Sequence, residues 1–159
     1  MRKLILAGVL LASLSVKAQK IYDPNADAKK EIEAAVKKAK EEGKHVLIQA
    51  GGNWCKWCLE FARFAKAEQQ VDSIIQSSYV WYHLNWSREN ENPEIFKKYG
   101  YPQRFGFPVF IILDGNGNRI HTQSSEYLED GGKSYEVKKV SEFLLNWTPA
   151  VLRDELYRK

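Results

Sequence analysis

Cysteine and histidine, the side chains that most often bind zinc, are scarce in this sequence. The cysteines are limited to Cys55 and Cys58, and the histidines to His45, His83 and His121. A Cys-x-x-Cys pair can supply half of a zinc site, but zinc needs two further ligands, and the three histidines are not paired at metal-site spacing. We therefore expect no bound metal.

A long apolar segment is also absent. The longest hydrophobic run covers residues 4–14, whereas crossing a bilayer takes about 20 residues. Arg2 and Lys3 precede the run and small residues within 16–18 follow it, a pattern typical of a secretory signal peptide over residues 1–18. The short run favours cleavage over an uncleaved anchor, and the lack of a following cysteine argues against a bacterial lipoprotein anchor.

Without this predicted leader, the sequence has almost equal numbers of positive and negative side chains. The whole chain has 24 basic and 20 acidic side chains and a net charge of +4. Arg2, Lys3 and Lys17 lie within 1–18, so a mature chain beginning at Gln19 has 21 basic and 20 acidic groups. This balance indicates neither nucleic acid nor an anionic membrane as a partner. Export, to the periplasm or outside the cell, would place the cysteines in an oxidising or redox-managed compartment.

The periodicity beyond the leader predicts one α/β domain. Repeats and low-complexity segments are absent, so we expect an irregular lead-in over 19–26, a domain over 27–148 and a C-terminal tail over 149–159. Helical and strand patterns alternate, and residues 114–118 are typical of a hairpin turn. This order predicts a three-layer α/β/α sandwich with a central mixed sheet of about four to five strands. The expected helices are 27–42, the cysteine motif to about Gln70, a turn at 71–76, 92–99 and 137–147; the expected strands are 45–50, 79–85, 109–113 and 119–123, and 124–134 is expected to be a loop.

The cysteine motif, Trp54-Cys55-Lys56-Trp57-Cys58, falls where a strand passes into a helix. Positions i and i+3 share a helix face, so the two sulfurs can close a small disulfide. The helix start favours an anion and lowers the pKa of Cys55, and Lys56 adds a nearby positive charge. We expect Cys55 to attack a substrate disulfide and Cys58 to resolve the mixed disulfide. A purely structural disulfide is the alternative, although so short a loop restrains the unfolded chain little.

The sequence resembles the thioredoxin superfamily over about residues 27–147. The resemblance rests on the Trp-Cys-x-x-Cys motif at a helix start, on Gly106-Phe107-Pro108 before an apolar strand, and on an Asp-Gly-Asn-Gly hairpin. It is strongest to exported and periplasmic thioredoxin-like modules in which a helix precedes the active-site strand. The resemblance implies a cis peptide bond at Pro108, next to the disulfide, and a backbone at Phe107 that pairs with an extended substrate chain.

Two positions depart from the family's usual pattern. Thioredoxins commonly have a buried acid six residues before the first cysteine, and here that position is Gln49, which cannot ionise. The family's lysine on the next strand corresponds to His83. We hypothesise that His83, or water, assists deprotonation of Cys58. The alternative is a strand histidine satisfied by local hydrogen bonds.

Aromatic side chains flank the motif. We expect Trp54 to be exposed, as part of an apolar docking surface for flexible polypeptide segments. Trp57 either joins that surface or packs its helix. Phe107, where many relatives have threonine or isoleucine, should narrow the substrate groove.

These features predict an exported thiol–disulfide oxidoreductase, in the first place a disulfide reductase acting on protein disulfides or dithiols. We expect a monomer with no cofactor beyond the Cys55–Cys58 disulfide, and an electron donor that is a membrane-bound or exported thiol relay. Two alternatives stay open: a non-catalytic binding module or chaperone with the thioredoxin fold, and a dedicated thiol reductant in cytochrome or metallocentre assembly.

Overall fold

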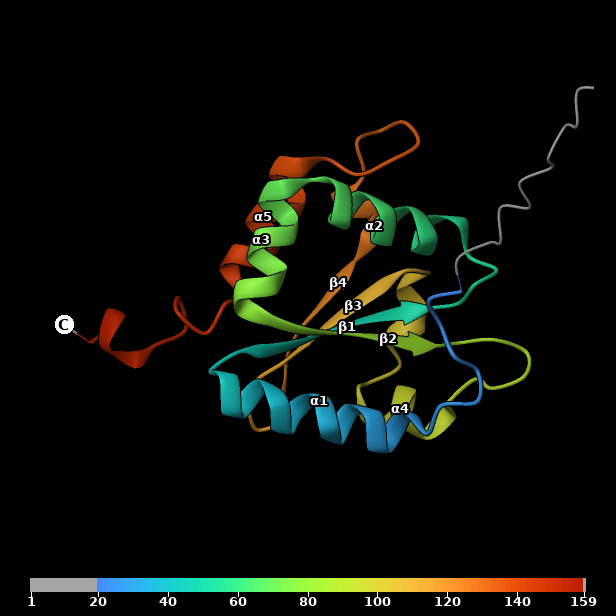
Figure 1. Cartoon of the computed structure of the whole chain (residues 1–159), viewed down its shortest axis with the longest axis horizontal. Coiled ribbons are helices and arrows are strands. Elements are labelled where there is room, and N and C mark those ends of the chain that lie inside the picture. The colour runs from blue at the N-terminus through green and yellow to red at the C-terminus, as the bar shows by residue number, and fades with distance from the viewer. Residues whose placement is uncertain (1–19, 159) are drawn as a thin grey trace, which may run out of the picture.

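The computed structural model describes residues 20–158, so the signal peptide predicted over 1–18 lies outside the described residues. Its central sheet has the strand order β2-β1-β3-β4 (Figure 1). The sheet is mixed, because β1 pairs in parallel with β2 and antiparallel with β3, and β3 pairs antiparallel with β4. The strands are β1 (His45–Gly51), β2 (Tyr79–Asn85), β3 (Val109–Leu113) and β4 (Arg119–Ser124).

Helices cover both faces of this sheet, which confirms the predicted three-layer sandwich. One face carries α1 (Ala28–Glu42) and α4 (Pro93–Lys98). The opposite face carries α2 (Lys56–Ala67), α3 (Gln69–Ser78) and α5 (Val137–Asn146), as Figure 1 shows. Both central strands, β1 and β3, are buried along their whole length, as expected for strands covered on two sides.

Successive residues of the central strands pack alternately into two separate hydrophobic cores. Leu47 and Ile112 pack with residues of α2, α3 and α5, whereas Val46, Ile48 and Ile111 pack with residues of α1 and α4. This alternation follows from the two-residue period of a strand. Each fully buried side chain of this size contributes about 1.5–3 kcal/mol to the stability of the fold. The two cores together hold the sheet in place, and the cysteine motif follows the end of its strand β1.

The ends of α1 agree with the sequence signals. The Asp27 side chain caps the helix by accepting a hydrogen bond from the Lys30 N–H at 3.2 Å. Gly43 ends it in the left-handed conformation with φ 66°, which a residue without Cβ adopts at little cost. The chain then enters β1 directly.

The helical region after the cysteine motif differs from the prediction. Glu68 is extended, with φ −88° and ψ 102°, so α2 stops short of Gln70. The turn predicted at 71–76 is a full helix, α3, whose buried Val71 and Ile75 pack in the same core as α2. No glycine or proline occurs at this break. The packing of two helices on one face of the sheet sets it, rather than a local sequence signal.

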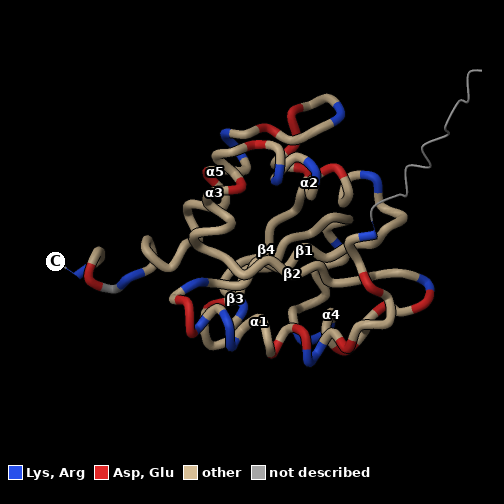
Figure 2. Tube along the Cα trace, viewed as in Figure 1, with Lys and Arg blue, Asp and Glu red and all other residues tan. Residues whose placement is uncertain are grey.

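Residues of both charge signs are interspersed along the outer helices and loops (Figure 2). This distribution agrees with the nearly balanced composition of residues 19–159. Within residues 20–158, no helix combines the length and the apolar character that crossing a bilayer requires.

Candidate active site

Cys55 and Cys58 form a disulfide at the start of α2, with their Cα atoms 5.2 Å apart. Cys55 is the N-cap residue, and its Sγ accepts a hydrogen bond from the Cys58 backbone N–H at 3.2 Å. Cys55 is 6% exposed and Cys58 is 0% exposed, so Cys55 is the outer cysteine. Lys56 is exposed beside them. The helix start therefore directs its partial positive charge at the sulfur expected to be the nucleophile.

Two glycines at the end of β1 make room for this arrangement. A Cβ at Gly51 would lie 2.4 Å from the Cys58 Sγ. A Cβ at Gly52 would lie 2.3 Å from the Trp54 Nε1 and 2.7 Å from the Trp86 carbonyl oxygen. All three distances are far shorter than a van der Waals contact, so a close approach requires each of these glycines.

The segment before β3 also packs against the disulfide. The Phe107–Pro108 peptide bond is cis, as the resemblance implied, and Pro108 is buried. The half-buried Phe107 side chain packs against the cluster that contains both cysteines. Among residues 20–158, the backbone N–H and C=O of Phe107 make no intramolecular hydrogen bond.

Trp54 is exposed, as predicted, with 59% of its surface accessible. Its ring is nevertheless held in place, because Nε1 donates to the Trp86 carbonyl at 2.7 Å and the ring meets Phe107 edge-on at 5.7 Å. An open cleft of about 490 Å³ lies beside it. The cleft is lined by Trp54, Trp86, Ser87, Arg88, Glu89 and Glu91.

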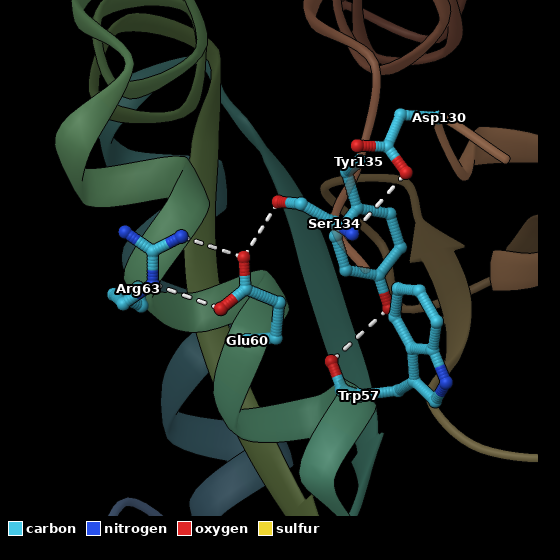
Figure 3. Close-up of polar contacts among 6 residues, drawn as sticks. All are labelled: Trp57, Glu60, Arg63, Asp130, Ser134 and Tyr135. Atoms are coloured by element: carbon cyan, nitrogen blue, oxygen red, sulfur yellow. Dashed lines mark hydrogen bonds and ion pairs between the residues drawn. The ribbon is translucent and has the colours of Figure 1, made fainter. Parts of the chain in front are cut away.

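Trp57 packs against the segment before α5, and it also lines an open cleft with Lys56, Glu60 and Lys133. Its ring is half-buried and meets Tyr135 edge-on at 5.4 Å, and the Tyr135 hydroxyl donates to the Trp57 carbonyl at 3.0 Å (Figure 3). The neighbouring Ser134 hydroxyl donates to Glu60 at 2.5 Å. Glu60 also forms an ion pair with Arg63, whose hydrogen bonds lower the pKa of that carboxyl.

These contacts tie α2 to the segment between β4 and α5. The sequence predicted a plain loop at 124–134, but Ser125–Leu128 forms a short 3-10 helix. Its buried Leu128 joins the core that contains α2 and α5, and that burial orders a stretch without a periodic sequence pattern.

Tyr22 is a site residue that the sequence analysis missed. It is 2% exposed and forms a cluster with Cys55 and Cys58. The Asn53 side chain holds it there: Oδ1 accepts from the Ile21 and Tyr22 N–H groups at 3.0 and 3.2 Å, and Nδ2 donates to the Tyr22 carbonyl at 2.7 Å. The lead-in has no regular secondary structure, so an aromatic residue ahead of the first helix was the only available signal.

Gln49 is fully buried next to Cys58, the less exposed of the two cysteines. Its Nε2 donates to the Tyr22 hydroxyl oxygen at 2.7 Å and to the Cys58 carbonyl at 2.8 Å. In the part of the chain that the structure describes, its Oε1 has no hydrogen-bond partner. At the position where the resemblance implied a carboxyl, this protein therefore has an amide that donates to the Cys58 carbonyl.

His83 pairs with Gln49 in the β1–β2 register, but its ring contacts are aromatic. Its centroid lies 5.5 Å from that of Tyr22 and 4.8 Å from that of Trp81. Within residues 20–158, its buried Nε2 has no hydrogen-bond partner among protein atoms. Burial lowers the pKa of His83 to about 4, and the charge of Lys66 acts in the same direction.

This lowered pKa predicts a pH-dependent stability. The unfolded chain takes up a proton near pH 6.5 and the folded protein only near pH 4, so the unfolded state gains protons first as the pH falls. The free energy of unfolding should decrease by about 3 kcal/mol between these values and show no further effect of His83 below them. Urea unfolding at pH 7 and pH 4 should show a smaller loss for His83→Phe than for wild type. Equal losses in the two proteins would contradict the assignment.

The other two histidines lie at Trp147. His45 Nδ1 is 2.8 Å from the Trp147 carbonyl oxygen, and the His121 ring stacks on the Trp147 ring at 4.2 Å. No group of three or more histidine, cysteine or acidic side chains within residues 20–158 is arranged to hold a metal ion.

Comparison with known proteins agrees with this geometry. A protein-family model described as thioredoxin-like matches residues 27–115, more than half of the chain. The thiol:disulfide interchange protein DsbD of Colwellia psychrerythraea is 26% identical over 113 residues, which cover 69% of this chain and 18% of that protein. The chain therefore spans less than a fifth of the length of this relative.

Two solved structures share the fold. A disulphide isomerase from Xylella fastidiosa Temecula1 matches with a TM-score of 0.68 and 22% identity, over 79% of this chain and 94% of that one. The oxidised C-terminal domain of Neisseria meningitidis DsbD matches with a TM-score of 0.54 and 20% identity, over 76% and 97%. The family match, the shared fold and the disulfide at the start of α2 lead to one conclusion: this chain belongs to the thioredoxin-like family.

Proposed function

We propose that the protein is an exported thiol–disulfide oxidoreductase that reduces disulfides in protein substrates. The observation that carries this proposal is the Cys55–Cys58 disulfide at the N-terminus of α2, with the outer Cys55 Sγ receiving a backbone N–H. A helix start is the environment that makes a thiolate available near neutral pH. The cis Phe107–Pro108 segment beside it supplies a place for substrate.

The reaction begins with the reduced protein. The Cys55 thiolate attacks one sulfur of a substrate disulfide, forming a mixed disulfide while the other substrate sulfur leaves with the electron pair. Cys58 then attacks Cys55, the bond to substrate breaks, and the Cys55–Cys58 bond forms. Two electrons pass from the protein to the substrate, and the protons of the two protein thiols end on the two substrate thiols.

The surface around Cys55 supports a polypeptide as substrate. Trp54 and Phe107 form an aromatic edge whose rings are fixed by the Trp86 carbonyl and by each other. The unpaired backbone N–H and C=O of Phe107 are suited to pairing with an extended chain, the mode in which main-chain bonds give affinity without sequence specificity.

The environment of Cys55 supports the reducing direction. Strong oxidants have a reduced form that is strongly stabilised. Here, within residues 20–158, the hydrogen-bond donor that the structure gives to the Cys55 sulfur is a backbone N–H, and no side-chain donor reaches it. This modest stabilisation favours a protein that donates electrons readily.

Export is supported by the charged and apolar pattern of residues 1–18. A reductase in that compartment needs a supply of electrons, and we propose a membrane-bound or exported thiol relay as the donor. The similarity to a protein named for thiol:disulfide interchange supports a thiol donor over a soluble cofactor. We propose that the protein works as a monomer with the disulfide as its only redox group.

Substrate docking on Trp54 can be tested by truncation. Trp54→Ala removes an exposed ring that is already ordered, so its loss should raise KM for a protein disulfide about tenfold with a smaller effect on kcat. The matched control is Tyr157→Ala, which removes an aromatic ring of 70% exposure from the C-terminal tail and should leave both constants unchanged. The measurement is the steady-state kinetics of a protein disulfide substrate. An unchanged KM for Trp54→Ala would contradict this role.

The proposed function is tested by insulin reduction with the mature protein and dithiothreitol as electron source. Wild type should accelerate insulin precipitation well above the rate with dithiothreitol alone, and the acceleration should require both cysteines. If substitution of neither cysteine alters the rate, the protein is instead a binding module with this fold.

A further inference from the structure

A buried tyrosine hydroxyl and a buried amide lie against the inner cysteine. The Tyr22 hydroxyl oxygen and the Cys58 Sγ both border the position that a Cβ at Gly51 would take, at 3.0 and 2.4 Å. Tyr22 and Cys58 are 2% and 0% exposed. The two buried atoms therefore border the same small space beside Gly51 and lie no more than about 5.4 Å apart.

The direction of the neighbouring hydrogen bonds can be assigned from chemistry. The atom of Gln49 that faces the Cys58 carbonyl at 2.8 Å must be the amide nitrogen, because a carbonyl only accepts. That same nitrogen lies 2.7 Å from the Tyr22 hydroxyl oxygen, which therefore accepts. In residues 20–158 this is the one hydrogen bond of the hydroxyl, so its proton is left without an acceptor in the oxidised protein.

We infer that Tyr22 is a positioning residue for Cys58, whose sulfur accepts a hydrogen bond from the Tyr22 hydroxyl once the disulfide is reduced. This inference rests on the proposed function, because it assigns the proton environment of the resolving step. In the oxidised protein the Cys58 sulfur is bonded to Cys55 and is a weak acceptor. Reduction turns it into a thiol, and when that thiol loses its proton in the resolving step, a hydroxyl donor in the buried site stabilises the attacking thiolate.

Tyr22 acts in this scheme as a donor and not as a base. Burial raises the pKa of Tyr22 far above its ordinary value, so the hydroxyl keeps its proton throughout the working range. In the resolving step Cys58 attacks Cys55, the Cys55–Cys58 bond forms and the bond to substrate breaks. The proton lost by the Cys58 thiol ends on the departing substrate thiolate, and the Tyr22 hydroxyl only lowers the free energy of the thiolate that attacks.

The titratable groups around Tyr22 do not supply a competing charge. His83 on β2 meets the ring edge-on at 5.5 Å, and burial lowers its pKa to about 4, so it is neutral at pH 7. Tyr135, which precedes α5, acts on Tyr22 electrostatically, and burial raises its pKa so that it too is neutral. Gln49 on β1 cannot ionise. The Tyr22 hydroxyl is therefore the polar group placed to stabilise the Cys58 anion.

The test is Tyr22→Phe, which removes the hydroxyl and keeps the ring. Removing a hydrogen bond to a charged group should raise the pKa of Cys58 by about one to two units. The probe is 5,5′-dithiobis(2-nitrobenzoate), which reacts with Cys55 in a first release of thionitrobenzoate and is displaced by Cys58 in a second. The second release at pH 7 should slow about three- to tenfold, because the smaller thiolate fraction is partly offset by greater nucleophilicity. The first release should stay within about twofold of wild type.

Tyr79→Phe is the matched control. Tyr79 is a buried tyrosine whose hydroxyl donates to the Leu144 carbonyl, in the core formed with α2, α3 and α5 and away from the disulfide. It should leave both releases unchanged. A Tyr22→Phe protein with an unaltered Cys58 pKa and second release would overturn the inference and leave the proposed function standing. A wild-type protein that shows neither release would overturn the proposed function and the inference together.

A measurement on the unsubstituted protein makes the test independent of folding in the variant. In the reduced protein the Cζ resonance of Tyr22 should shift with pH at the midpoint at which Cys58 titrates, since the two groups share a hydrogen bond. A Tyr22 resonance that does not change across the Cys58 titration would overturn the inference.

Discussion

Cys55→Ser should lower the rate of protein disulfide reduction by about 10³-fold or more. Serine cannot form the mixed disulfide, and removal of a covalent nucleophile removes the route that depends on it. Cys58→Ser should behave differently, because Cys55 keeps its place at the N-terminus of α2 and its hydrogen bond from the backbone N–H of residue 58. That variant should attack substrate normally and then stall.

Each variant is first reduced and freed of reductant, then incubated with a disulfide-containing protein substrate, and the products are compared on non-reducing gels. Cys58→Ser should accumulate an adduct that dithiothreitol releases, and Cys55→Ser should accumulate none. Adducts of equal yield in both variants would show that the two cysteines are not divided into nucleophile and resolving residue.

Gly51→Ala should destabilise the protein by about 3 kcal/mol or more and impair closure of the disulfide. The added Cβ would lie 2.4 Å from the Cys58 Sγ and 3.0 Å from the Tyr22 hydroxyl oxygen, and neither can move away easily. Cys58 is held on α2 by its backbone, and Tyr22 is held by Asn53. Overpacking of a site this rigid falls at the upper end of the known range.

The measurement is the denaturant midpoint of the oxidised protein, followed by the extent of Cys55–Cys58 oxidation in a glutathione buffer. Gly115→Ala is the matched control, because the nearest atom to its Cβ would be 3.6 Å away, an ordinary contact. It should change stability by less than about 0.5 kcal/mol. A Gly51→Ala protein as stable as this control would contradict the close packing of β1 against the disulfide.

The features that the sequence predicted correctly are those with a local signal. The strand at His45–Gly51 follows from a continuous apolar run, and the end of α1 at Gly43 follows from a residue that tolerates a left-handed conformation. The position of Cys55 at a helix start follows from the change of period after Gly52. Each of these depends on neighbours within a few residues, so the pattern alone was sufficient.

The features that the sequence did not predict depend on contacts between distant segments. Tyr22 reaches Cys58 only because Asn53, 31 residues further along, binds its backbone. Glycine is needed at position 51 because the Cys58 side chain approaches it from the following helix. The break at Glu68 has no local breaker and is decided by packing on the sheet.

The family resemblance predicted which residues lie next to each other more reliably than it predicted their hydrogen-bond partners. It placed Gln49 and His83 beside each other, and the β1–β2 register confirms that pairing. It did not indicate that the Gln49 amide would donate to the Tyr22 hydroxyl, because that contact depends on a lead-in segment outside the matched region. The role proposed for His83 in deprotonating Cys58 stays a prediction, since the ring contacts in the structure are to Tyr22 and Trp81.

The reduction potential of the Cys55–Cys58 pair tests the central claim most directly. The mature protein is equilibrated in glutathione or dithiothreitol buffers of known potential, and the fraction oxidised is measured by thiol alkylation and mass. A redox-active pair of a reductase should be half-reduced near about −270 mV. A pair that stays oxidised below about −300 mV, as a structural disulfide does, would contradict the assignment of Cys55 and Cys58 as an exchange site.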